Sequence, residues 1–133
     1  MQLQRQAGTD VEVADQILKL DSHVAQAYYQ KALVCYEAGD FGGVIENQRL
    51  ALENAPYVLA YYEGYIQMLA VGVQLYTQAG SEGSTEICRK ELRSVPQMLQ
   101  QVLEKTSALG WKINDKPELT LPTEYQGLLK QFG

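Results

Sequence analysis

The spacing of apolar residues along the chain predicts helices. From residue 25 onward, apolar side chains recur three and four positions apart, which places them on one side of a helix of 3.6 residues per turn. A second such series follows, with one polar interruption at Gln48. The first series consists of Tyr28, Ala32, Cys35 and Tyr36, and the second of Val44, Ile45, Gln48, Ala51 and Leu52.

A short glycine-containing segment, AGDFGG at 38–43, separates the two series. Gly39 is suited to the left-handed conformation that ends a helix, and Asp40 is well placed to cap the helix that follows. The second series ends at Pro56. Residues 25–56 therefore predict a hairpin of two antiparallel helices.

This hairpin resembles the tetratricopeptide repeat family, whose pattern has a period of about 34 residues. Its aromatic, small, turn and closing-proline positions are matched by Tyr28, Ala32, Gly39, Asp40, Phe41, Ala51 and Pro56. It departs from the family at Lys31, Cys35, Val44 and Gln48. The resemblance implies stacked hairpins in a short superhelix that binds other proteins.

The segments on either side extend the repeat. A shift by one repeat lays 16–23 over 50–57, so residues 10–22 look like the second helix of an earlier repeat. The turn recurs at 79–84, and we expect long helices at about 58–78 and 84–107. Pro96 lies inside the second of these, where it predicts a kink or a break.

The last part of the chain has a different pattern. Residues 107–122 have no helical period, and they predict an extended segment packed back on the helices. The apolar residues of that segment are Leu109, Trp111, Ile113, Leu119 and Leu121. A short helix is expected at about 123–132. We thus predict one all-α domain over 1–133, made of a half-repeat (10–22), a repeat (25–56), an enlarged, divergent repeat (57–107) and a packed-back tail (108–133).

The last third also resembles the soluble C-terminal ends of O-antigen ligase-like polysaccharide membrane proteins of bacteria. The similarity rests on ICRKEL, VPQMLQQV and ALGWKINDKPELTLPTEY, at 87–92, 95–102 and 108–125. It implies an accessory, membrane-tethered domain of a protein whose enzymatic part lies elsewhere. A free-standing adaptor would instead be expected in the cytoplasm.

The net charge and the hydropathy of the chain argue against two classes of partner, nucleic acids and the membrane interior. The formal net charge is -5, and no cluster of Lys and Arg offsets it, which argues against nucleic acid. The longest strongly apolar stretch, 68–75, is far shorter than the roughly 20 residues that cross a bilayer. We therefore expect neither nucleic-acid binding nor membrane insertion by this segment.

The inventory of catalytic side chains is small. His23 is the single histidine, and because it directly follows Asp21 and Ser22 the three cannot form a triad. Cys35 and Cys88 lie far apart and form no CxxC motif. We predict no catalytic residue, metal site or cofactor, and therefore no enzyme.

Tyrosine is the remaining distinctive feature, since eight of the nine lie between residues 28 and 76. We expect Tyr28, Tyr62 and Tyr65 to pack between helices. The tetratricopeptide resemblance implies a concave binding surface formed by the first helix of each repeat, without the charged clamp of chaperone-binding members. The residues at those positions are Gln26, Tyr29, Leu33, Tyr36, Glu37, Glu63 and Gln67. A protein or peptide is the expected partner, and the half-repeat could also mediate self-association.

Overall fold

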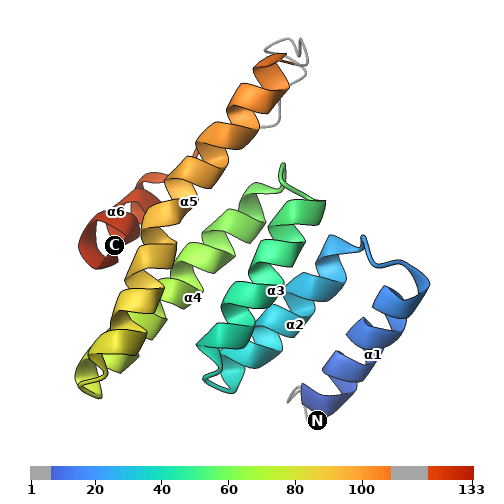
Figure 1. Cartoon of the computed structure of the whole chain (residues 1–133), viewed down its shortest axis with the longest axis horizontal. Coiled ribbons are helices and arrows are strands. Elements are labelled where there is room, and N and C mark those ends of the chain that lie inside the picture. The colour runs from blue at the N-terminus through green and yellow to red at the C-terminus, as the bar shows by residue number, and fades with distance from the viewer. Residues whose placement is uncertain (1–6, 109–119) are drawn as a thin grey trace. The chain divides into compact units, whose positions relative to one another are not determined.

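The computed structural model describes residues 7–108 and 120–133, with side chains from 11–105 and 120–133. All regular secondary structure in these residues is helical, so the predicted all-α class is confirmed (Figure 1). The helices are α1 (Ala7–Leu20), α2 (Ala25–Glu37), α3 (Phe41–Asn54), α4 (Leu59–Gln78), α5 (Glu82–Ala108) and α6 (Thr123–Phe132). They belong to two compact units, α1 to α3 in residues 1–55 and α4 to α6 in 56–133.

In the first unit, α2 lies between α1 and α3, and consecutive helices run in opposite directions (Figure 1). Alanines occupy much of the interior, and their small side chains let neighbouring helices approach closely. The buried apolar residues of this unit are Ala14, Ala25, Ala27, Ala32, Val34, Phe41, Val44, Ala51 and Leu52. The antiparallel hairpin predicted for 25–56 is therefore present as α2 and α3.

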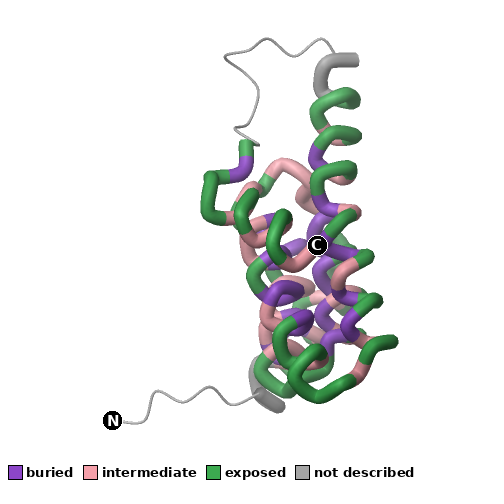
Figure 2. Tube along the Cα trace, turned by 90° about the vertical axis from the view of Figure 1, so that its left-hand side faces the viewer, coloured by how far each residue is buried: buried purple, intermediate pink, exposed green. Residues whose placement is uncertain are grey.

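In the second unit, α4 and α5 form a longer antiparallel hairpin, and α6 packs against both of them. Short buried stretches recur between exposed ones along α5 (Figure 2). The core includes Tyr62, Tyr65, Ile66, Leu69, Val73, Cys88, Leu92 and Val95. Leu121 is buried as predicted, whereas Leu109, Trp111, Ile113 and Leu119 lie outside the described residues.

Helix α5 runs through Pro96 without interruption, so of the two alternatives predicted there a break is wrong, and a kink stays a prediction. Proline removes one backbone donor, but packing of an apolar face can hold a helix across such a defect. Val95 and Leu99 are buried on either side of Pro96, which is itself exposed. The buried face of α5 thus continues past the position where the backbone hydrogen bond is lost.

Both hairpins turn by the same backbone motif. Gly39 and Gly80 have φ values of 76° and 73°, the left-handed conformation in which glycine is favoured. The following amides, of Asp40 and Ser81, each donate to the carbonyl five residues earlier, at 2.8 and 2.9 Å. The Asp40 carboxylate accepts from the Gly43 amide at 3.0 Å, which confirms the predicted cap of α3.

Helix ends elsewhere in the chain also share their backbone geometry. The amide of Asp21 donates to the Ile17 carbonyl, and the amide of Ala55 donates to the Ala51 carbonyl, both at 2.9 Å. Helices α2 and α4 begin after Val24 and Val58, two extended residues without a side-chain cap. The same four-residue bond is made at the ends of α2 and α4, by Ala38 and Ala79, so it is the ordinary last turn of an α-helix. The starts of α2 and α4 are alike in their extended, uncapped residues.

Candidate protein interaction surface

Five of the predicted binding residues lie along one side of α2. Their spacing of three and four positions places them on a single face of this helix. Tyr29, Leu33 and Tyr36 are half-buried, whereas Gln26 and Glu37 at the two ends of the row are exposed. The structure therefore brings these five together on one mixed apolar and polar surface, called the α2 surface below.

Tyr36 also packs against an aromatic residue that the sequence did not identify as its neighbour. Its ring meets the ring of Phe41 edge to face, with centroids 6.0 Å apart and planes at 86°. Phe41 is almost completely buried at the start of α3. Because such aromatic pairs stabilise a fold, only part of the Tyr36 ring remains for a partner.

The other two predicted residues, Glu63 and Gln67, lie on α4 in the second unit. Gln67 is exposed and Glu63 is half-buried. Partial burial, together with the nearby carboxylates of Glu63 and Glu124, raises the pKa of Tyr125 on α6. Glu63 therefore lies near α6. The tail was predicted to pack back on the helices, but the sequence did not indicate that α6 would contact α4.

Four of the eight clustered tyrosines have a structural role. Tyr61, Tyr62 and Tyr65 are at most 8% exposed, which confirms the predicted packing role of the last two. The Tyr65 hydroxyl donates to the Glu91 carboxylate, which is itself buried. Tyr28 is half-buried, and its hydroxyl donates to the Ser22 carbonyl at 2.9 Å. Tyr29 and Tyr36 are thus the members of the cluster that belong to the α2 surface.

A small apolar cleft lies between α1 and α2. It has a volume of about 200 Å³ and is lined by Val13, Ala14, Ile17, Val24, Gln26, Ala27 and Gln30. Gln26 connects the cleft to the α2 surface, while Val13 and Ile17 also contribute to the exposed side of α1. The spacing of Val13, Ile17 and Leu20 in the sequence indicates an apolar side of α1. The cleft beside it was not predicted.

Two further hollows lie in the second unit, and neither contains a predicted residue. One, of about 540 Å³, adjoins the turn between α4 and α5, and its lining includes Glu82, Glu86 and Arg89. The other, of about 340 Å³, is an apolar groove between α5 and α6 with Leu99, Leu103 and Leu129 in its walls. Of these three hollows among the described residues, the cleft of the first unit is the one that shares a residue, Gln26, with the predicted set.

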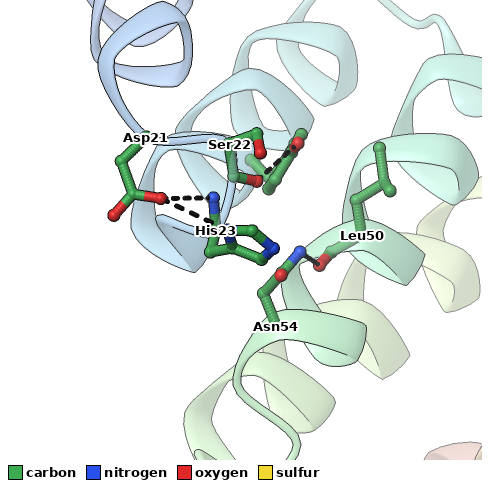
Figure 3. Close-up of polar contacts among 6 residues, drawn as sticks. Asp21, Ser22, His23, Leu50 and Asn54 are labelled. Carbon is green, nitrogen blue, oxygen red and sulfur yellow. Dashed lines mark hydrogen bonds and ion pairs between the residues drawn. The ribbon is translucent and has the colours of Figure 1, made fainter.

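The backbone turns at His23, between α1 and α2, and polar contacts of the neighbouring residues hold this turn (Figure 3). The Asp21 carboxylate accepts from the backbone amide of His23 at 2.9 Å and lies 3.4 Å from the Nδ1 atom. The Ser22 carbonyl is occupied by Tyr28. Asp21 and Ser22 thus act locally, by closing the connection between α1 and α2.

The remaining candidates for reactive groups among the described side chains are the two cysteine thiols. Burial, with a contribution from the Asp40 charge, raises the pKa of the Cys35 thiol, and burial raises that of Cys88. Both cysteines are therefore weaker nucleophiles than a free thiol at neutral pH. Among the described residues, no group of His, Cys, Asp and Glu could hold a metal ion, and none of the described helices is both long and apolar enough to cross a membrane.

Comparisons with known proteins leave the surface to be interpreted from its own chemistry. No family model, curated protein or solved structure matches this chain.

Proposed function

We propose that this protein is a non-catalytic interaction module that binds a segment of another protein on the α2 surface. The observation that carries the proposal is the row of half-buried Tyr29, Leu33 and Tyr36 between exposed Gln26 and Glu37. Tyrosine and leucine supply apolar contact area at an accessible site, and the flanking polar groups can fix the register of a bound segment.

The chemistry of this row favours a partner with apolar or aromatic anchors. The α2 surface carries one acidic residue, Glu37, and none of its five side chains is basic. A terminal carboxylate or a phosphate would therefore find no cation there. An amphipathic helix with apolar residues three and four positions apart could lay that face along Tyr29 and Leu33.

The proposal can be tested with peptides selected from a displayed random library, followed by amide NMR titration of the whole chain. We expect binders whose chemical-shift changes concentrate at residues 26–37. Replacement of Tyr29 by alanine should weaken binding more than about tenfold, a loss of about 1.4 kcal/mol that is common for an interface tyrosine. Tyr36→Phe should bind nearly normally, because it keeps the ring that contacts Phe41.

A matched control is Ile87→Ala, which removes an exposed apolar side chain from α5 in the second unit. Binding should be unchanged in this variant. Selected peptides that bind the Tyr29→Ala chain as tightly as the original chain would show that the α2 surface is not the binding site.

A further inference from the structure

One face of α1 presents exposed apolar side chains. Val13, Ile17 and Leu20 are 49%, 38% and 89% exposed, and their spacing of four and three residues forms one stripe along the helix. On the side that faces α2, by contrast, Ala14 is buried. Isolated exposed apolar residues are common, but a continuous apolar stripe on a helix marks an interaction surface.

The register of α1 shows that this stripe has the position of a helix-packing face. The 34-residue shift that lays 16–23 over 50–57 also brings the last residues of α1 and α3, Leu20 and Asn54, together. It aligns Ile17 with Ala51 and Val13 with Asn47. On α3 the Asn47 side chain is buried, and its Nδ2 atom lies 4.0 Å from the Cys35 Sγ atom of α2. The equivalent position on α1 is an exposed valine.

The stripe borders the cleft between α1 and α2. Val13, Ala14 and Ile17 line that cleft on the α1 side, and Val24 and Ala27 line it on the α2 side. Leu20 is the most exposed of the large apolar residues described and lies at the C-terminal end of α1. One surface therefore carries both a projecting apolar side chain and an apolar hollow.

We propose that this surface binds the same surface of a second copy, with the two α1 helices antiparallel about a two-fold axis close to Ile17. This arrangement places Leu20, three residues after Ile17, level with Ala14 of the second copy, three residues before it. Each Leu20 then inserts at the cleft of the opposite chain, and the two Ile17 side chains meet at the axis. A surface that contains both knob and hole can pair with itself in this way.

The charged residues of α1 whose side chains are described lie away from the stripe, so they offer a basic partner no carboxylate there. At 100° per residue, Glu12, Asp15 and Lys19 lie about 100° or more around the helix from the centre of the stripe. The Asp15 carboxylate is paired with Lys31 of α2 at 2.9 Å. Two chains of net charge -5 repel each other over most of their surfaces, so they require an uncharged contact such as this stripe.

Sedimentation equilibrium of the whole chain from about 10 μM to about 1 mM tests the proposal, because an interface this small should be weak. We expect the mass to rise from one chain to two. Ile17→Glu and Ile17→Lys should each raise the dimer dissociation constant more than about tenfold. An equimolar mixture of the two variants should dimerise again, because opposite charges then meet at the axis.

Leu20→Glu provides a second variant at a position so exposed that folding should tolerate it, and it should also be monomeric. Ile87→Glu, at a 60% exposed position on α5, should dimerise like the original chain. The proposal is overturned if the original chain stays monomeric at about 1 mM, or if Ile17→Glu and Leu20→Glu dimerise normally. A mixture of Ile17→Glu and Ile17→Lys that remains monomeric would exclude the two-fold axis at Ile17.

Discussion

Tyr28 of α2 and Tyr62 of α4 make the same hydrogen bond. Each hydroxyl donates to the backbone carbonyl six positions earlier, that of Ser22 at 2.9 Å and that of Pro56 at 2.7 Å. The two bonds differ in their surroundings, since Tyr62 is 1% exposed and Tyr28 is half-buried. The chain thus contains one tyrosine–carbonyl contact in two environments.

Replacement of each tyrosine by phenylalanine removes the same hydrogen bond in a buried and in a half-buried setting. The difference in stability between the two variants then measures the effect of burial. Tyr62→Phe should lower the free energy of unfolding by about 1–2 kcal/mol, because it removes a hydrogen bond in a buried setting. Tyr28→Phe should cost less than about 0.5 kcal/mol, since water can replace the hydroxyl at the Ser22 carbonyl. Urea denaturation at neutral pH measures the free energy of unfolding of the two variants. Equal losses in Tyr62→Phe and Tyr28→Phe would show that burial does not determine the cost of removing this hydrogen bond.

Tyr62 should also make the protein less stable at alkaline pH. Burial, with a smaller contribution from Tyr57, raises the pKa of Tyr62 from 10.0 to about 12. Between these two values the unfolded chain loses this proton and the folded chain keeps it. The Tyr62 contribution to stability is therefore complete below pH 10 and is lost as the pH rises toward about 12.

A shift of this size corresponds to at most about 2–3 kcal/mol. Unfolding free energies measured through this pH range should fall more steeply for the original chain than for Tyr62→Phe. The Tyr28→Phe chain is the matched control and should keep the steep decline. If the original chain and Tyr62→Phe have parallel profiles, Tyr62 is not the group responsible.

Gly42 and Gly43 are neighbours at the start of α3, but they should respond oppositely to alanine. A Cβ atom on Gly43 would lie 2.5 Å from the Cys35 Sγ atom and 2.6 Å from the Asp40 Oδ2 atom. The Asp40 carboxylate would have to move and weaken its cap, so Gly43→Ala should lose about 1–3 kcal/mol of stability.

The nearest atom to a Cβ on Gly42 is the Asp40 Oδ1 atom, at an ordinary 3.6 Å. Gly42→Ala should therefore stabilise the protein by about 0.5–1 kcal/mol, through the lower backbone entropy of the unfolded chain. Thermal unfolding of the two variants side by side gives the comparison. A stable Gly43→Ala chain would show that Cys35 and Asp40 can move aside at little cost.

Gln48 is a stability defect within the α3 core. It is fully buried, and among the described side chains its amide nitrogen and oxygen are the buried polar atoms without a hydrogen-bond partner. Methionine has a similar shape and no strong polar group to desolvate, so Gln48→Met should raise the free energy of unfolding by about 1–2 kcal/mol. Gln74→Met, at an exposed position on α4, should change it little. A destabilised Gln48→Met chain would indicate that the amide has a partner after all.

Local chemistry explains which parts of this fold could be predicted. Gly39, Asp40 and the apolar spacing act over four or five residues, so the α2–α3 hairpin and its cap follow from the sequence. The second turn, at Gly80, could be located by its similarity to the first. Helix α6 was also predicted correctly, at Thr123–Phe132.

The errors and omissions concern contacts between distant residues. Helix α5 continues through Pro96 because of buried neighbours that a local rule does not include. Tyr36 was placed in the apolar series of its helix and among the binding residues, but its contact with Phe41 was not predicted, because that contact depends on how the hairpin closes. Glu63 was predicted as a binding residue on α4, and its proximity to Tyr125 depends on where α6 docks. The spacing of residues along the sequence indicated on which face of its helix each residue lies, but not which residue of another helix it contacts.

The tight turns at Gly39 and Gly80 have a consequence for the order of folding. Each joins two helices through very few residues, so the contacts within each hairpin link residues that are close in sequence. Proteins dominated by such local contacts fold rapidly, typically within microseconds to milliseconds. Helix α6 is different, because Thr123 follows Gln78, the last residue of its partner α4, by 45 positions. Docking of α6 on α4 must bring together residues that far apart in sequence, and we expect it to be the slow step in the assembly of the second unit.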